Sequence, residues 1–249
     1  MVLENLIIKE IGLSLDLFRR LVGECDEVIL KKKEYLLRQG QVCSFIGFVE
    51  TGVLRSYIEK EGEDYISDFH FQGSFATSYR SFLTIEASVG SIQALENSVL
   101  YCLSKSNYDQ LLQTSNEGYK LGKYIADTLF IKKCRKETSL LMDDALERYK
   151  LLLRTYPHIE QHVSQYHIAS YLGIKPESLS RIFAANKSIM NKIAVFIVLI
   201  ILNCCTSMEK KNVARTNLLS IQLREKQGLS KVEIKKVVIP VNGKAEYHL

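Results

Sequence analysis

The chain has 249 residues, of which 47% are hydrophobic, and it contains only three prolines. This composition supplies a substantial core and excludes an intrinsically disordered or collagen-like chain. Charge is uneven: residues 1–153 hold 19 basic and 22 acidic side chains, residues 154–192 hold 5 and 2, and the remainder holds 9 and 4. Any polyanionic partner is therefore expected to meet the C-terminal part of the chain.

The first predicted element is a short amphipathic helix over residues 14–24. Ser14 is a suitable N-cap, and Leu15, Phe18 and Leu21 fall on one helical stripe. The residues before it include early acids and no small-residue cleavage site, so no secretion signal is predicted and the protein is expected to be cytoplasmic.

A β-structured region follows the helix. Short β-branched and aromatic runs are separated by Gly40, Gly52, Gly62 and Gly73, about ten to twelve residues apart. Two further strands flank a turn at Glu96–Asn97. This spacing predicts an antiparallel β-roll, that is, a sandwich or barrel of the double-stranded jelly-roll type.

Helical periodicity returns after Ser106. A short helix is predicted at 107–115, and the following stretch to Tyr156 reads as one long helix or as two joined near Thr138. Pro157 ends this run because proline cannot continue a helix. Its wide apolar stripe indicates either core packing or pairing with a symmetry mate, and it contains Leu121, Tyr124, Ile125, Leu129 and Ile131.

Residues 163–181 have the pattern of a helix-turn-helix. Ile168 and Leu172 lie on one helix face, and Gly173 supplies a left-handed residue that ends the first helix. Pro176 suits the first position of a second helix, and Leu179 returns to the core. An ordinary helical hairpin is the alternative.

The second of these helices presents side chains suited to nucleic acid. Arg181 can donate two bonds to guanine, Glu177 can accept from cytosine, and Ser180 lies on the same outward face. The alternative role for Glu177 is a partner of the helix dipole. Residues suited to contacts with the DNA backbone are Ser164, Gln165 and Ser178.

Together these segments resemble the Crp/Fnr family of transcription regulators, and more closely its branch common in Bacteroidetes. The resemblance covers residues 10–183 and is carried by "RQGQVCSFIGFVETGVLRSY", "SIQALENSVLYCLS", "ALERYKLLL" and above all "HVSQYHIASYLGIKPESLSRI". It implies an α+β fold with a cyclic-nucleotide-binding-like β-roll, a dimerising long helix and a winged-helix-like DNA-binding domain. Double-stranded DNA and a second copy of the chain are the implied partners, with RNA polymerase a further candidate. Pro176 stands where the best-known member has an arginine, so one base contact is expected to be lost.

The resemblance also points to a degenerate effector pocket. Cyclic-nucleotide binders of this superfamily use a Gly-Glu pair and a later Arg-Ser or Arg-Thr pair, whereas this chain has Gly73–Ser74 and Ala87–Ser88. Because both charged partners are absent, cyclic AMP is not expected as the effector. Arg80 could serve another anion, so the candidate pocket residues are Gly73, Ser74, Arg80 and Ser88.

No cofactor, metal site or enzymatic activity is predicted. No Gly-rich phosphate loop, G-x-S-x-G or H-E-x-x-H motif occurs, and Asp143–Asp144 reads as a solvated pair on a polar helix face. The cysteines have no C-x-x-C spacing and are expected to be reduced; they are Cys25, Cys43, Cys102, Cys134, Cys204 and Cys205.

The family pattern stops after Phe183. Residues 193–202 are ten apolar residues, too few to span a bilayer alone, and from Met190 to Cys204 the chain resembles a lipoprotein signal peptide. One interpretation is a helix or strand that completes the DNA-binding domain. The other is a composite reading frame, in which a regulator truncated in its recognition helix is joined to a lipoprotein-like frame.

These observations predict four regions: a β-roll sensor at 1–113, connecting and dimerisation helices at 114–156, a helix-turn-helix domain at 157–189, and an extension at 190–249 with a basic tail. The predicted function is a dimeric transcription regulator that binds a palindromic operator. The alternative is a sensing or interaction module with impaired DNA binding, associated with a membrane only if the apolar segment is exposed.

Overall fold

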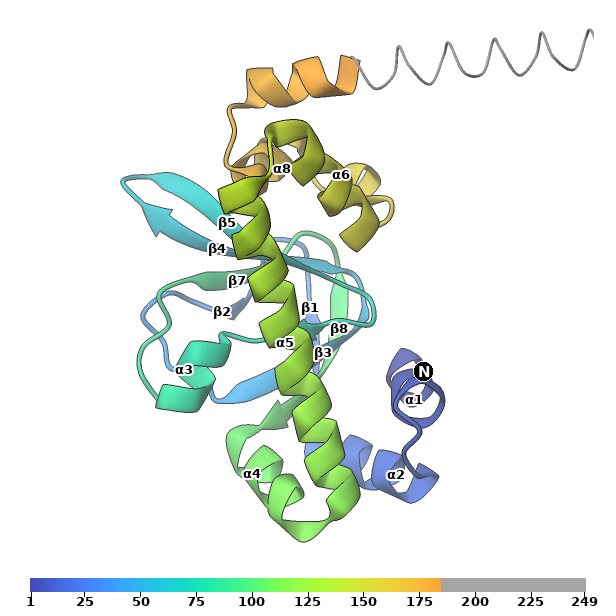
Figure 1. The fold of residues 1–249 in the computed structure, drawn as a ribbon. Helices are drawn as coiled ribbons and strands as arrows, with labels where there is room; N and C mark the ends of the chain where they lie inside the picture. The colour runs from blue at the N-terminus through green and yellow to red at the C-terminus, as the bar shows by residue number, and fades with distance from the viewer. Residues whose placement is uncertain (185–249) are drawn as a thin grey trace, which may run out of the picture. The chain divides into compact units, whose positions relative to one another are not determined.

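Two four-stranded antiparallel sheets make up the β-structured region in a computed structural model that describes residues 1–184 (Figure 1). The first sheet has the order β1-β8-β3-β6, formed by Cys25–Leu30, Ser98–Ser104, Phe45–Thr51 and Phe75–Ala76. The second has the order β2-β7-β4-β5, formed by Tyr35–Leu37, Ser91–Ala94, Val53–Lys60 and Glu63–Phe71. Consecutive strands repeatedly change sheet, so the predicted antiparallel β-roll is confirmed.

The glycine-marked turns occur where the spacing predicts them. Gly40, Gly52, Gly62 and Gly73 all have positive φ, between 80° and 92°. Gly52 also lies where no side chain fits, because a Cβ atom there would be 2.2 Å from the Ser98 hydroxyl oxygen. The turn between β3 and β4 therefore needs glycine both for its backbone conformation and for its close contact with β8.

The N-terminal helices pack against strands β3 and β8 of the first sheet. They are α1 (Val2–Glu4), the π-helix η1 (Asn5–Glu10) and α2 (Leu15–Glu24). Ser14 caps α2 by accepting a hydrogen bond from the amide of Leu17 at 3.1 Å, as predicted. Phe18 and Leu21 are buried, but Leu15 is 41% exposed and Leu17 is buried in its place. The predicted stripe is therefore confirmed at Phe18 and Leu21 and is wrong at Leu15, because the buried face of α2 includes Leu17 instead.

Four further helices follow in the chain: α3 (Tyr79–Thr84) inside the roll segment, then α4 (Lys105–Thr114), α5 (Asn116–Met142) and α6 (Ala145–Thr155). The long helical stretch therefore breaks at Asp143–Asp144, and the predicted junction near Thr138 is wrong. Asp144 caps α6 by accepting from two backbone amides at 2.9 Å each, and Asp143 accepts from the Ser139 hydroxyl at 2.6 Å. The acidic pair marks a helix start and does not lie on a polar helix face, because a carboxylate satisfies the first amides of a helix.

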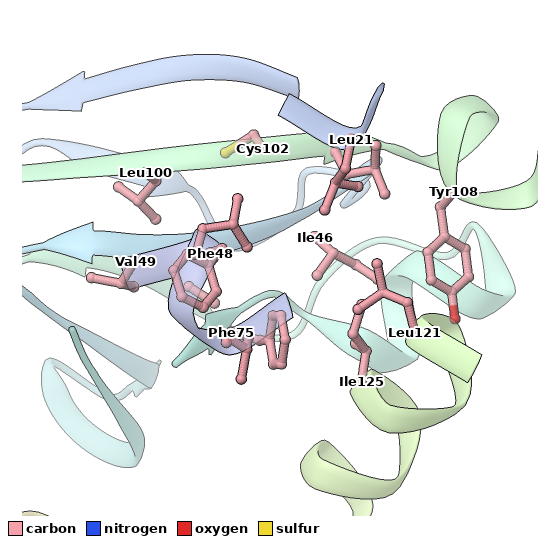
Figure 2. Packing of buried hydrophobic residues seen from close by; sticks show 14 of the residues in the cluster. Leu21, Ile46, Phe48, Val49, Phe75, Leu100, Cys102, Tyr108, Leu121 and Ile125 are labelled. Atoms are coloured by element: carbon pink, nitrogen blue, oxygen red, sulfur yellow. The ribbon is translucent and has the colours of Figure 1, made fainter. Parts of the chain in front are cut away.

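The apolar stripe of α5 serves the core in its first half. Leu121 and Ile125 are buried, and Figure 2 shows both pointing toward Tyr108 and Ile46. Tyr124 and Leu129 pack beside them. Ile131, at the end of the predicted stripe, is 48% exposed. Core packing therefore accounts for the first four residues of the stripe and does not account for Ile131.

A second core joins the roll to the C-terminal helices. Here α7 (Ile159–His162) and α8 (Gln165–Leu172) are followed by a helix that begins at residue 176. Buried side chains from β4 and β5, including Val53 and Phe69, pack with Leu152, Ile168 and Leu179. Residues 1–184 consequently form one compact unit, and the predicted domain boundaries within it stay predictions.

Everything predicted for the chain beyond residue 184 lies outside the described residues. This applies to the end of the recognition helix, any wing, the apolar segment at 193–202 and the basic tail. Among the helices of residues 1–184, none combines the length and the apolar character needed to cross a membrane.

Candidate functional site

The turn of the helix-turn-helix is a Schellman motif. Ser164 caps the first helix, α8, by accepting from the amide of His167 at 3.3 Å. Gly173 ends it with φ 66° and ψ 35°, and the amides of Gly173 and Ile174 donate to the carbonyls of Ser170 and Ala169 at 3.1 Å each. The left-handed residue closes the last turn of α8 and sets the direction in which the chain leaves it.

The second helix starts at Pro176, where the missing amide proton is not needed. Leu179 is fully buried, and Phe183 packs edge-to-face on Tyr149 of α6 with ring centroids 5.2 Å apart. Ala169 on α8 is also fully buried. These apolar contacts fix one face of the second helix and leave its other face to solvent.

That solvent face carries the side chains predicted to read bases. Glu177, Ser180 and Arg181 are all exposed, and their spacing of three and four residues places them on one side of the helix. The predicted backbone-contacting residues Ser164, Gln165 and Ser178 are exposed as well. The Ser164 hydroxyl already serves as the α8 cap. The DNA contacts of all six residues stay predictions.

Polar contacts hold α8 on the β4–β5 hairpin. Arg55 is buried and donates from Nη1 to Asp64 and to His167 Nε2, both at 2.8 Å. Because Nε2 accepts this bond, the ring proton of neutral His167 is on Nδ1. Burial and the neighbouring Arg55 lower the pKa of His167, so this contact keeps the imidazole neutral. On the same helix, the Ser170 hydroxyl donates to the Asp64 carbonyl at 2.7 Å.

A second network surrounds Asp68 at the end of β5. Its carboxylate accepts from Lys132 at 2.9 Å and from the Tyr156 hydroxyl at 2.5 Å. Burial opposes ionisation, but Lys132, His70 and Tyr156 together hold the pKa of Asp68 below its usual range. Burial also lowers the pKa of Lys136 to about 8, although its ammonium donates to two β5 carbonyls and lies 3.7 Å from the Tyr171 ring centroid.

The network around Asp68 borders a cavity of about 910 Å³ between the roll and helices α5, α6 and α8. The β3–β4 and β5–β6 turns form one wall, which includes Gly73 and Ser74. The basic side chains that line it are Lys132, Arg135, Lys136 and Arg148. No motif in the sequence singled them out. The available signal was the spacing of Lys132 and Lys136, which continues the inward positions of Leu121 and Ile125 along α5.

The four predicted effector-pocket residues separate into two places. Gly73 and Ser74 line the cavity, but Arg80 and Ser88 do not. Arg80 is exposed and forms an ion pair with Glu86 at 2.8 Å. Ser88 is buried; its hydroxyl donates to Gly90 O at 2.7 Å and lies 2.9 Å from the Ser78 hydroxyl. The partner of Ser88 is thus Ser78, which the sequence reasoning missed because only contacts across the α3 segment bring the two together.

No group of three or more His, Cys, Asp or Glu side chains within residues 1–184 is arranged to hold a metal ion. The four cysteines in that range are free thiols. Burial raises the pKa of Cys25 and of Cys102 to about 12, with neighbouring acids adding to the shift at both positions. Both groups are therefore protonated and poor nucleophiles at neutral pH.

In a comparison with protein families, residues 27–115 match the model of the cyclic nucleotide-binding domain. No curated protein sequence matches the chain. Among solved structures, it is similar to FixK2 from Bradyrhizobium japonicum, with 17% identity, a TM-score of 0.57, and 66% of this chain and 85% of that chain covered. The chain is also similar to a CooA mutant from Carboxydothermus hydrogenoformans, with 18% identity and a TM-score of 0.56. That comparison covers 76% of this chain and 84% of the CooA chain.

A protein from Eubacterium rectale assigned to the Crp/Fnr family of transcriptional regulators gives 17% identity and a TM-score of 0.53, with 71% of this chain and 84% of that chain covered. At these identities the likeness concerns the fold. The predicted α+β arrangement of β-roll, long helix and C-terminal helix pair is therefore confirmed.

Proposed function

We propose that this chain, whose fold is that of the Crp/Fnr transcription regulators, is a DNA-binding transcription regulator that acts as a homodimer. The observation that carries the proposal is the second helix of the helix pair. Its apolar side is fixed by the buried Leu179, and its free side presents Glu177, Ser180 and Arg181 together. A helix held in this way is a rigid probe that fits a major groove.

The reading chemistry follows from the exposed groups. In the proposed complex, Arg181 donates two parallel hydrogen bonds to guanine O6 and N7, and Glu177 accepts a hydrogen bond from the cytosine amino group. Gln165 and Ser178 are exposed near the starts of the two helices, where contacts to phosphate fix the register.

A homodimer is supported by apolar side chains on the solvent side of α5. Phe130 is 68% exposed and Leu141 is 79% exposed. Eleven residues separate them, or about three helical turns, so both lie on one side of α5. Exposed apolar surface of this extent favours burial against another chain. A two-fold axis along α5 would present two copies of the second helix to DNA half-sites about 34 Å apart. We therefore expect the operator to be palindromic.

The proposed regulator does not use cyclic AMP as its effector. The chain has no arginine or glutamate at Gly73–Ser74 or Ala87–Ser88, and Ser88 is instead bonded to Ser78 and Gly90. A cyclic phosphate there would be buried without a cationic partner, which is costly.

The proposal is tested by selecting genomic fragments with the full chain and measuring affinity for the enriched site by fluorescence anisotropy at several salt concentrations. Arg181→Ala should weaken specific binding by about 1–3 kcal/mol and leave nonspecific affinity nearly unchanged. Arg154→Ala removes an exposed arginine of α6 outside the reading helix and should leave the discrimination intact.

Two results would count against this assignment. Equal loss of affinity on all sequences would mean that Arg181 contacts only phosphate. Failure of the unaltered chain to enrich any sequence, with no salt-dependent binding to duplex DNA, would remove the regulator function.

A further inference from the structure

The charged side chains that line the cavity between the roll and the C-terminal helices are mainly basic, although most of the lining comes from a net acidic part of the chain. Four basic side chains line it and Glu96 is the single acid among its lining residues, although residues 1–153 as a whole are net acidic. Glu96 is itself engaged, since its carboxylate lies 2.9 Å from His162 Nδ1. The cavity wall is therefore positive in a part of the protein that is otherwise slightly negative.

The four cations differ in how far the protein satisfies them. Lys132 is paired with Asp68, and Lys136 donates to the Ile66 and Ser67 carbonyls. Arg135 forms no hydrogen bond or ion pair within residues 1–184. In the same range, the Arg148 guanidinium donates one bond, from Nη1 to the Asp143 carbonyl at 2.9 Å, and its buried Nε has no acceptor. Within the described residues, the Arg135 guanidinium and Nη2 of Arg148 thus retain donors for an anion, whereas the buried Nε of Arg148 is not accessible from the cavity.

Basic and apolar side chains both line the cavity. Along α5, Tyr124 lies beside Phe75 of β6, and Arg135 follows about three turns later. Leu140 of α5 and Leu151 of α6 also line the cavity near the two arginines. Arg135 is eleven positions after Tyr124, which corresponds to about 16 Å of helix. A volume of about 910 Å³ is within the range of small-molecule sites, which combine apolar walls with a few placed polar groups.

We propose that this cavity binds a small organic phosphate, with its phosphate against Arg135 and Arg148 and its organic part against Tyr124 and Phe75. A phosphate dianion matches two arginines better than a single carboxylate does, because its three terminal oxygens can accept two parallel bonds from Arg135 and a further bond from Arg148. The site is separate from the Ser78–Ser88 pair of the roll, neither member of which lines the cavity.

A ligand in this position would touch both parts that a regulator must couple. The wall formed by Gly52 and Gly73 belongs to turns of the roll, and the wall formed by Tyr171 and Leu172 belongs to the first helix of the helix pair. Occupancy would therefore bias how the helix pair sits on the roll. This regulatory role rests on the proposed function, whereas binding of the ligand does not.

The test is isothermal titration of the full chain with inorganic phosphate, pyrophosphate and AMP, against chloride at matched ionic strength. Saturable binding is expected, with AMP tighter than inorganic phosphate because only AMP also reaches Tyr124 and Phe75. Arg135→Gln and Arg148→Gln should each weaken AMP binding at least tenfold. Arg80→Gln and Arg154→Gln, which alter arginines that do not line the cavity, should change it less than twofold.

The proposal is overturned if none of the three probes binds saturably, or if the two control variants lose as much affinity as the cavity variants. Arg135 is exposed and unbonded within the described residues, so Arg135→Gln keeps the test valid even if Arg148→Gln fails to fold. Operator binding is measured on the same samples. Probe binding without DNA binding would retain the cavity site and remove the proposed function. DNA binding without probe binding would retain the proposed function and remove the cavity site.

Discussion

His70 should make the folded chain sensitive to mild acid. The imidazole is buried in the roll, with Nδ1 2.9 Å from the Phe75 carbonyl and Nε2 2.7 Å from the Ser56 hydroxyl. Burial lowers its pKa from 6.5 to about 4, with Asp68 opposing the shift and Lys132 adding to it. The unfolded chain therefore binds a proton between these two values that the folded chain does not bind.

The size of the effect follows from this difference. Stability is at its full value above pH 6.5, falls as the pH drops through 6.5 and levels off near pH 4. For a single group with these values, lowering the pH from 7 to 5 costs about 2 kcal/mol of unfolding free energy. Asp68 acts in the same direction but at lower pH, because its folded pKa lies below 3.8.

Urea denaturation of the full chain at pH 7 and pH 5 measures this cost. His70→Gln should be less stable than the unaltered protein at pH 7 but should lose about 2 kcal/mol less on acidification. His167, whose pKa is also lowered, remains in both proteins and cancels in the comparison. His158→Asn is the control, because His158 is exposed and its left-handed backbone, with φ 67°, suits Asn. An equal loss in His70→Gln and the unaltered protein would refute the reasoning.

Three further substitutions have defined outcomes. Gly118→Ala places a Cβ atom 2.1 Å from a backbone oxygen of α4 and should lower the free energy of unfolding by about 1–3 kcal/mol in urea denaturation. Gly23→Ala is the control, because no atom lies within 4 Å of its Cβ position; it should leave the unfolding free energy unchanged or raise it by up to about 1 kcal/mol. Tyr156→Phe removes the bond to the partly buried carboxylate of Asp68 and should cost about 1.5–3 kcal/mol; no change would mean that water replaces the hydroxyl. Phe130→Glu should give a monomer in sedimentation and weaken operator binding, and an unaltered protein that sediments as a monomer would contradict the dimer.

The local features of this protein follow directly from its sequence. The glycine spacing predicts the turns of the β-roll, and all four glycines have the positive φ that such turns require. Ser14 caps its helix, and the run from Ile168 to Leu179 gives the helix pair with its left-handed Gly173. These predictions hold because backbone conformation at a turn or cap depends on a few neighbouring residues.

What the sequence left open depends on contacts between distant segments. The break at Asp143–Asp144 was read as a solvated acidic pair, because helical periodicity does not show which residue satisfies the next helix's first amides. Ser88 meets Ser78 across α3, and Arg55 meets His167 across 112 positions of the chain. The spacing of residues along the chain shows on which face of a helix or strand a side chain lies. It does not show which distant segment packs against that face.

The basic side chains of α5 and α6 show most clearly what the sequence determines and what only the tertiary structure decides. Helical periodicity places Lys132, Lys136 and Arg148 on helices, as the structure has them, but no sequence motif marks them as members of a site. Only the packing of α5 and α6 against the roll turns them toward one cavity, because that placement is set by the second core and not by any local pattern.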